Sequence, residues 1–170
     1  MFSNVIDFEN KAEDEIIEFL YKIFKKDFID NHTFLANKVY IDPKKDDIER
    51  SINKPKIYWH IVSKVNPRNK KREFDSNRGC RIHWIKPIIL NNQNPKIKLF
   101  YHLEKTGKIR LYLWAYDFDF IVILQKLGSV SSYLVTSFYI DRNYNKEIYE
   151  KRYRNYISKK DIGLRGCEWF

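Results

Sequence analysis

The residues of this chain that could do chemistry are histidines, cationic side chains and hydroxyl groups. Cleavage of RNA by its own 2′-hydroxyl needs a base, an acid and groups that stabilise the charged phosphorane, and it needs no metal. Histidine is the natural acid or base near neutral pH, and Arg, Lys and hydroxyl groups bind phosphate. His60 stands between Trp59 and Ile61, with Ser63 and Lys64 after it. If this run is a strand, His60 and Lys64 project to one face; the alternative is an ordinary core or surface histidine.

Two further groups of candidates follow along the chain. Arg78, Arg81 and His83 lie near the start of an expected helix, where they and the backbone could receive a phosphate, or where they form a solvated helix face. Thr136 and Tyr139 belong to the last expected strand, in which a threonine is usually structural. Thr136 is expected to face the same way as Leu134 and Phe138. His32 and His102 have no companions that single them out, so we interpret them as structural.

The sequence lacks the residues that other classes of reaction require. Five scattered glycines cannot build a phosphate-binding loop, so ATP- and NAD-dependent chemistry is not expected. The carboxylates of Asp117-Phe118-Asp119 could hold Mg²⁺, but they lie between two expected strands, where a turn needs polar residues anyway. Neither Cys80 nor Cys167 has a nucleophile or zinc context. We therefore expect no metal and no cofactor.

The charge indicates an anionic partner. The net charge is +10, and residues 54–86 carry ten basic and two acidic side chains, whereas residues 1–30 carry four and eight. Coding bias toward lysine explains part of the excess but not its clustering, so nucleic acid is favoured. The basic residues expected to bind RNA are Arg68, Lys70, Lys71, Arg72, Arg78, Lys86 and Arg152.

Composition and length favour one folded domain. The 170 residues are 44% hydrophobic and include 28 aromatics, enough for a core. The opening residues lack the pattern of a signal peptide, and nowhere do 18 apolar residues run together, so we expect a soluble, cytoplasmic protein, or one delivered into a target cell's cytoplasm.

The patterning predicts an α+β fold. We expect helices over 12–28, 42–51, 77–90 and 142–157, a strand from residue 56, and then four antiparallel strands starting with a hairpin around Gly107. FIVILQKL is expected to be central in the sheet. The expected architecture is N-terminal helices packed on one face of a curved four-stranded antiparallel sheet, with a C-terminal helix. The expected division is an N-terminal helical region over 1–55, a domain over 56–157 and a tail over 158–170.

Several of these sequence segments resemble segments of a known protein superfamily. YWHIVSK, RGCRIHWIKPII, KIRLYLWAY, FIVILQ and LVTSFYI resemble, in order and spacing, the phage- and mobile-element-associated branch of the BECR superfamily, over residues 56–156. That superfamily includes barnase, EndoU, colicin-type tRNases and RelE-like toxins. The resemblance implies a metal-independent endoribonuclease of toxin type, for which tRNA is one fitting substrate. Whether a cognate antitoxin or immunity protein exists is left open by the sequence.

The resemblance also implies roles for individual residues. His60 becomes the acid or base, Lys64 and Arg81 become phosphate ligands, Thr136 becomes a donor to the scissile phosphate, and Tyr139 orients it. His83 stands where relatives have arginine, and it could replace His60 in one role. Gly79-Cys80 departs from the expected cysteine followed by an acid.

Two other functions stay open beside this one. The first is a catalytically silent nucleic-acid-binding protein of a phage or mobile element. The second is a protein–protein adaptor that uses the acidic first helix.

Overall fold

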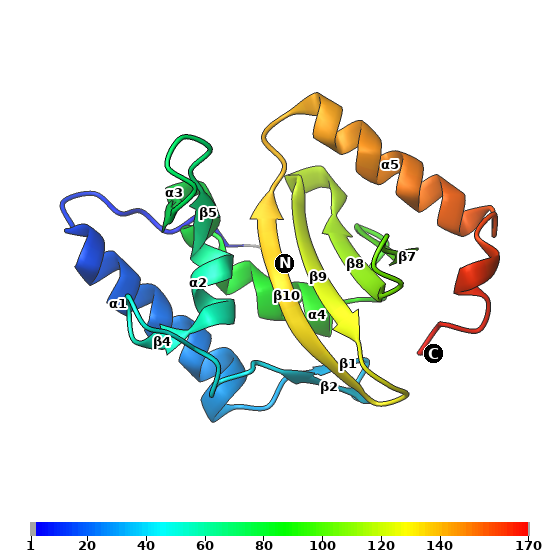
Figure 1. The fold of residues 1–170 in the computed structure, drawn as a ribbon, viewed down its shortest axis with the longest axis horizontal. Helices are drawn as coiled ribbons and strands as arrows, with labels where there is room; N and C mark the ends of the chain where they lie inside the picture. Colours follow the sequence, from blue (N-terminus) through cyan, green and yellow to red (C-terminus); the bar gives the residue numbers. More distant parts are fainter. Residues whose placement is uncertain (1–2, 170) are drawn as a thin grey trace.

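A computed structural model describes residues 3–169 and has an α+β architecture. Figure 1 shows a strongly curved sheet with helices around it. The helices are α1 (Glu13–Phe24, continued by a π-helix over Lys25–Asp30), α2 (Lys56–Val62), α3 (Ser76–Gly79), α4 (Ile85–Leu90) and α5 (Asn143–Ile157), with short 3-10 turns at Ile82–Trp84, Tyr116–Phe118 and Ile162–Leu164.

The main sheet has six strands in the order β1-β2-β10-β9-β8-β7. They are β1 (Phe34–Leu35), β2 (Val39–Asp42), β7 (Ile97–Leu103), β8 (Ile109–Ala115), β9 (Phe120–Lys126) and β10 (Ser131–Tyr139). Two small ribbons stand apart, β3 (Ile48–Glu49) with β4 (Lys54–Pro55), and β5 (Ser63–Val65) with β6 (Arg72–Phe74).

The strongest sequence patterns are confirmed. The first helix buries Ile16, Ile17, Leu20 and Phe24 and begins with three acidic residues, as the helix dipole favours. β7 and β8 form the predicted hairpin, with Gly107 at φ 76° in its turn. β9 lies between β8 and β10 with six of its seven residues buried, and α5 occupies the predicted C-terminal position.

The four predicted antiparallel strands, β7 to β10, are present, but they are only part of a six-stranded mixed sheet. β2 pairs with the start of β10 in parallel, with Tyr40 opposite Ser131, and β1 adds a sixth strand beyond it. Val39 and Ile41 are fully buried in this pairing. A four-residue strand that pairs with a segment ninety positions later leaves no local pattern to detect, so the sheet is mixed rather than antiparallel.

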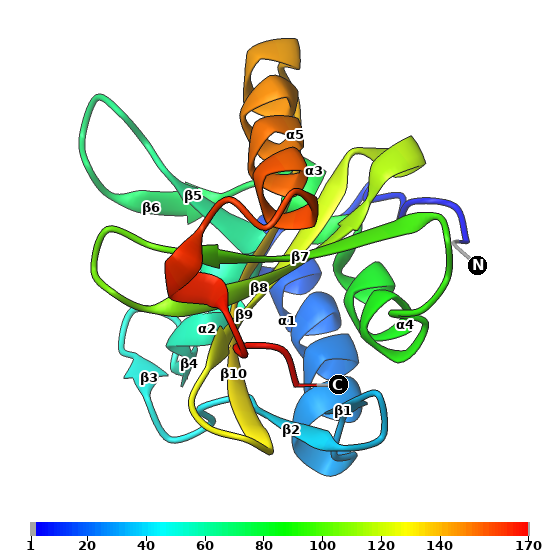
Figure 2. The same ribbon diagram turned by 90° about the vertical axis from the view of Figure 1, so that its right-hand side faces the viewer.

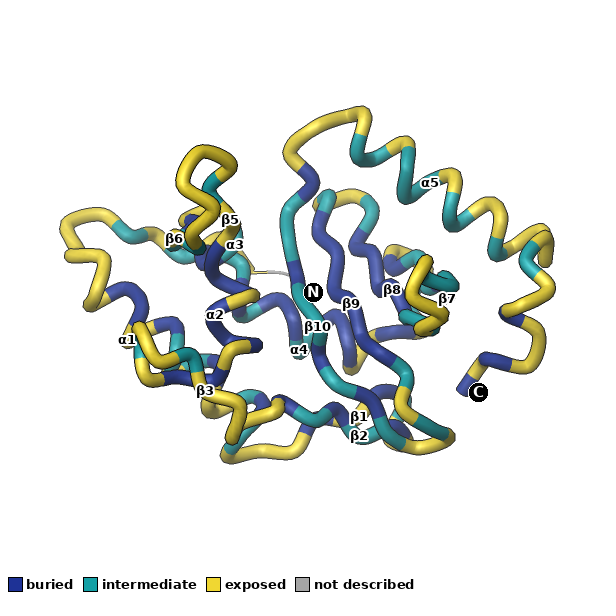
Figure 3. The backbone as a smooth tube through the Cα atoms, in the orientation of Figure 1, coloured by how far each residue is buried: buried dark blue, intermediate teal, exposed yellow. Residues whose placement is uncertain are grey.

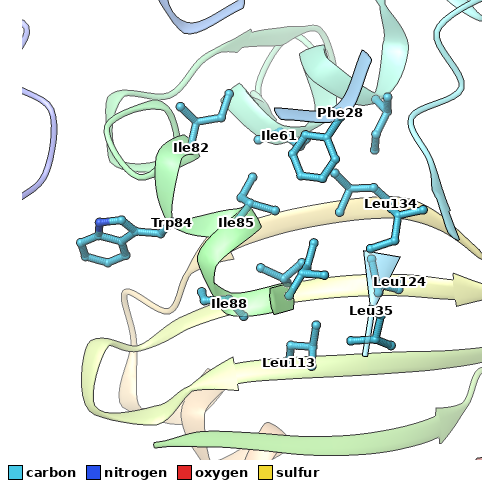
Figure 4. Packing of buried hydrophobic residues seen from close by; sticks show 14 of the residues in the cluster. Phe28, Leu35, Ile61, Ile82, Trp84, Ile85, Ile88, Leu113, Leu124 and Leu134 are labelled. Atoms are coloured by element: carbon cyan, nitrogen blue, oxygen red, sulfur yellow. The ribbon is translucent and has the colours of Figure 1, made fainter. Parts of the chain in front are cut away.

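The prediction that the helices pack on one face holds for α1, α2 and α4 but is wrong for α5. Side chains alternate along β8, so that Leu111 and Leu113 join a core with α1, α2 and α4, while Tyr112 and Trp114 join a second cluster under α5. We call these two sides the inner face and the outer face. Figure 3 shows the sheet strands as largely buried, and Figure 4 shows Ile85 and Ile88 of α4 packed with Leu113 and Leu124 on the inner face.

Two local predictions between residues 42 and 63 are wrong. The expected helix over 42–51 is a turn, because the Asp42 carboxylate accepts a hydrogen bond from Lys44 N (2.7 Å) and Lys44 has a positive φ. The expected strand from residue 56 is helix α2, whose Tyr58 hydroxyl donates to Ile17 O (2.5 Å). The β-branched and aromatic composition of α2 suggested a strand, but burial between α1 and β10 makes the helix stable.

The expected helix over 77–90 is divided. α3 ends at Gly79, a 3-10 turn follows at residue 82, and α4 begins at Ile85. A side chain at Gly79 would lie 2.8 Å from Leu20 of α1 and 2.9 Å from Phe74, so the close approach of α3 to α1 requires glycine there.

The expected tail packs against the sheet. Leu164, Cys167 and Trp169 are buried, and the Trp169 indole donates to Gly128 O (2.7 Å). Figure 2 shows this segment in red, passing close to β7 and the end of α5. Within residues 3–169, no helix is long and apolar enough to cross a membrane.

Candidate functional site

A polar cleft lies beside the end of β10. Only the first three residues of β10 pair with β2, so the rest of that edge has no neighbouring strand and approaches α2 and α3 instead. The cavity has a volume of about 370 Å³. It is lined by Lys64, Asp75, Asn77 and Arg78 on one side and by Phe138, Tyr139, Ile140, Asp141, Asn145 and Tyr149 on the other.

Lys64 and Asp75 hold the wall formed by β5 and α3. Asp75 is 8% exposed; its Oδ1 accepts from Arg78 N (3.1 Å) as the N-cap of α3, and its Oδ2 lies 2.8 Å from Lys64 Nζ. The Lys64 ammonium is exposed, so a phosphate could compete for it, but only by weakening this ion pair.

Arg78 crosses from this wall toward α2 and β10. Its Nη1 donates to His60 O (3.1 Å), and its guanidinium lies 5.7 Å from the Phe138 ring centre. The charges of Asp75 and Asp141 are close enough to act on it. Arg78 is therefore a fixed cation of the cleft.

Arg81 and Tyr139, predicted to share a site, are in contact. The Arg81 guanidinium lies 4.4 Å from the Tyr139 ring centre and 5.5 Å from that of Trp84. Its Nη1 donates to Asn77 O (2.7 Å), while its Nε is buried with no hydrogen-bond partner in the described chain. The Arg81 guanidinium thus packs against the Tyr139 ring, and Tyr139 itself lines the cleft.

His60 lies next to the cleft but does not line it. It is exposed on α2, with its carbonyl bound by Arg78. Partial burial of the ring lowers its pKa, and the charges of Arg72 and Arg78 lower it further, against the opposing effect of Glu49 and Asp47. At neutral pH His60 is therefore uncharged and able to accept a proton.

Arg72 completes a group of cations around His60. Its Nη1 donates to the carbonyl (3.1 Å) and the hydroxyl (3.2 Å) of Ser63. The predicted common face of His60 and Lys64 does not exist, because the helix ends at Val62 and the chain turns into β5.

The loop between β5 and β6 presents cations in a fixed conformation. The Glu73 carboxylate accepts from the side-chain amides of Asn66 (2.9 Å) and Asn69 (2.7 Å), and these two residues in turn accept from backbone N–H groups of the loop. The only carboxylate of the ribbon is thus occupied by amides. Arg68, Lys70 and Lys71 are exposed and form no ion pair within residues 3–169.

His83 and Lys86 lie in another environment. His83 Nε2 is 3.1 Å from Asn4 O, its Nδ1 has no hydrogen-bond partner in the described chain, and burial lowers its pKa. Lys86 Nζ lies 3.8 Å from Asp27 Oδ1. The neighbours of His83 and those of His60 are different residues, so the structure does not bring these two histidines together.

Thr136 and Arg152 belong to the outer face. β10 has a bulge between Leu134 and Thr136, after which Thr136 pairs with Ile123 and Tyr139 with Phe120. Thr136 therefore shares a face with Phe138, as predicted, but faces opposite to Leu134 and Tyr139. Arg152 of α5 donates to the Tyr112 hydroxyl (2.8 Å), away from the cleft.

The sequence predicted three of the ten residues that line the cleft, Lys64, Arg78 and Tyr139, and missed the other seven. Asp75 could have been found, because an Asp-Ser pair before a short helix is an N-cap signal. Asn77 of α3 and Asp141 before α5 have no such signal, and Asn145 and Tyr149 have none because α5 joins the cleft only through the tertiary fold.

Among residues 3–169 there is no group of three His, Cys, Asp or Glu side chains placed to hold a metal ion. Comparison of the chain with protein-family models, with curated proteins and with solved structures found no match. The resemblance to the BECR superfamily therefore stays a prediction.

Proposed function

We propose that the protein binds RNA, with the β5–β6 ribbon and the adjoining cleft as the binding surface. The observation that carries the proposal is the ribbon loop, in which Arg68, Lys70 and Lys71 are exposed and unpaired while Glu73 is bound by two asparagine amides. A loop ordered in this way loses little entropy when it meets a phosphate backbone.

The cleft extends this surface with groups suited to nucleotides. Arg78 offers a fixed cation, Tyr139 and Tyr149 offer aromatic rings, and Asn77 and Asn145 offer amides. Aromatic stacking and cationic contacts are how proteins hold unpaired RNA.

The test is an affinity measurement with tRNA over a salt series. The variant Arg68→Gln/Lys70→Gln/Lys71→Gln should lose at least about tenfold in affinity at low salt, and its dependence of log affinity on log salt should be shallower by about 2. The matched control Lys45→Gln/Lys105→Gln/Lys108→Gln removes the same charge from exposed lysines elsewhere. Equal losses in both variants, or stronger binding to duplex DNA than to RNA, would contradict the proposal.

Endoribonuclease activity is the second candidate, and the lowered pKa of His60 beside Arg72 and Arg78 favours it. A neutral imidazole could take the 2′-hydroxyl proton, and the two guanidiniums could stabilise the phosphorane. Since His60 lies outside the cleft lining, the ribose would have to sit over the end of α2.

Incubation of the protein with total RNA in EDTA tests this chemistry. Cleavage by the wild type that falls by at least about 100-fold in His60→Gln, with RNA affinity retained, is the expected result for the enzyme. Intact RNA with the wild type would leave RNA binding as the function.

A further inference from the structure

A second cavity lies toward the end of α5, and its Arg152 lies 5.5 Å from the ring centre of Tyr149, which lines the cleft. Its volume is about 400 Å³, and it lies between β7, the last turns of α5 and the segment over 160–164. Asn145 of the cleft and Asn155 of this cavity are ten residues apart on the same helix, which corresponds to about 15 Å. The residues that line it are Tyr101, His102, Arg152, Asn155, Tyr156, Lys160, Asp161, Ile162, Gly163 and Leu164.

Three nitrogen-bearing side chains of this cavity have no carboxylate partner. Arg152 is held by the Tyr112 hydroxyl (2.8 Å), and its guanidinium lies over the rings of Tyr112 (5.6 Å) and Tyr149 (5.5 Å). Neither Arg152 nor Lys160 forms an ion pair within residues 3–169. The His102 ring stands edge-on to Tyr112 at 6.2 Å.

The nearby carboxylates are already engaged. Glu104 accepts from the Tyr112 hydroxyl (2.6 Å) and lies 3.7 Å from Arg110. Asp161 Oδ1 accepts from Gly163 N (2.9 Å). Among the residues that line the cavity, the two cations Arg152 and Lys160 outnumber the single carboxylate of Asp161, which leaves one positive charge in excess.

The end of α5 opposes an anion there only weakly, because several of its last carbonyls already accept hydrogen bonds. The last carbonyls of a helix carry partial negative charge. In α5 these carbonyls are bound: Ser158 donates to Arg154 O (2.8 Å from its hydroxyl), and Lys160 N donates to Asn155 O (3.2 Å).

A smaller cavity of about 260 Å³ adjoins the 400 Å³ cavity and shares Tyr156, Asp161 and Leu164 with it. The Tyr156 ring and Leu164 offer apolar surface, which suits a planar organic group. Its lining also includes the cations Lys159 and Arg165 and the carboxylate of Glu168, which accepts a hydrogen bond from the Tyr156 hydroxyl (3.3 Å). The paired cavities thus offer a charged half and a partly apolar half.

We propose that these two cavities bind a nucleotide, with its phosphate on Arg152, Lys160 and His102 and its base against Tyr156. The guanidinium fork of Arg152 matches phosphate geometry, and the Tyr112 hydroxyl positions that fork. The same chemistry has two sources, a free nucleoside monophosphate or the terminal nucleotide of an RNA strand. The site is separate from the proposed RNA-binding ribbon and does not depend on it.

The test uses AMP and inorganic phosphate as probes in isothermal titration calorimetry on the full chain. Arg152→Gln/Lys160→Gln should weaken AMP binding at least about tenfold, because it removes both cationic hydrogen-bond donors to the phosphate. The control Lys151→Gln/Arg154→Gln removes two charges from exposed positions of the same helix that line neither cavity, and it should change the affinity less than about twofold.

A second measurement requires no variant. Addition of AMP to the wild type should shift the ring proton signals of His102 in the NMR spectrum, whereas the signals of His32, which lies outside both cavities, should stay in place. Absence of AMP binding at millimolar concentration, equal losses in the two double variants, or a His102 signal that does not move would each overturn the proposal.

The two sources are separated with RNA oligonucleotides that differ only at the 5′ end. If the ligand is an RNA terminus, a 5′-phosphate should strengthen binding over a 5′-hydroxyl in the wild type but not in Arg152→Gln/Lys160→Gln. If AMP binds and the two oligonucleotides bind equally, the ligand is a free nucleotide. Loss of RNA binding in the ribbon variant with AMP binding retained would separate this site from the proposed function.

Discussion

The two faces of the sheet are built from different chemistry. The inner face is a closed core of aliphatic and aromatic side chains, in which Leu111, Leu113, Val122 and Leu124 are fully buried. The outer face is aromatic and carries cations: Lys98 lies 3.2 Å from the Tyr116 ring centre, and Arg152 and Arg78 lie over Tyr112 and Phe138. The inner face therefore specifies the fold, while the outer face holds positive charge near the surface.

The cleft lies where these two faces meet. Phe138 belongs to the outer cluster and Tyr139 to the inner one, and both reach the cleft because that edge of β10 has no neighbouring strand. A site at such an edge can combine a rigid base with exposed cations, which explains why four of the residues singled out from the sequence, Lys64, Arg78, Arg81 and Tyr139, lie in or against it.

The largest expected effect comes from removing the inner face's N-terminal elements. A variant that starts at Pro43 lacks α1, β1 and β2, so it exposes the buried surfaces of α2 and β10. We expect it to show no cooperative unfolding transition in urea followed by circular dichroism. A cooperative transition would instead show that the chain folds without its first 42 residues, which would favour the predicted division between an N-terminal region and a following domain.

A pair of truncations compares the faces directly. Leu113→Ala on the inner face should cost about 3–5 kcal/mol, because its cavity is sealed on all sides. Tyr153→Ala on the outer face removes a half-buried ring that meets Phe100 edge-on at 5.9 Å, and it should cost about 1.5 kcal/mol. Urea unfolding of both variants measures the loss of unfolding free energy in each, and equal losses would refute the distinction between the faces.

The pH dependence of the folding stability should reflect the half-buried histidines His83 and His102. Burial lowers the pKa of His83 and His102 below the ordinary value of 6.5, with Arg152 adding to the effect at His102 and Glu104 and Asp161 opposing it. The unfolded chain therefore binds protons at higher pH than the folded one, so stability is full above 6.5 and falls as the pH decreases below it. Urea midpoints between pH 7 and 5 should decline less in His83→Gln/His102→Gln than in the wild type; identical slopes would argue against these shifts.

The smallest effect is expected at Thr136. It is half-buried on the outer face and does not line the cleft. Thr136→Ala should leave tRNA affinity within about twofold and stability within about 0.5 kcal/mol. A marked loss of RNA cleavage with normal binding would restore the role that the family resemblance assigns to this residue.

Local patterns made part of the fold predictable. The spacing of Ile16, Leu20 and Phe24, the Gly107 turn and the apolar run of β9 each indicate one structure within a few residues. The pairing of β2 with β10 and the helical state of Lys56–Val62 depend on distant partners, which no local window contains.

The same reason limited the site prediction. Arg81 and Tyr139 were placed together correctly. The helix breaks after Gly79, and His83 lies away from His60. The bulge after Leu134 set Leu134 and Thr136 on opposite faces. One inserted residue in a strand moves the side chains that follow it to the opposite face of the sheet, and a break in a helix also changes the direction of side chains. Amino-acid composition predicts neither event.

The pairing of β2 with β10 also has a consequence for synthesis on the ribosome. Tyr40 O accepts from the Ser132 hydroxyl across 92 positions of sequence. At ordinary elongation rates that interval corresponds to about 5–20 s, during which the nascent chain displays Val39 and Ile41 on an unsatisfied strand edge. We therefore expect chaperones to bind the emerging chain during that interval, before its release from the ribosome.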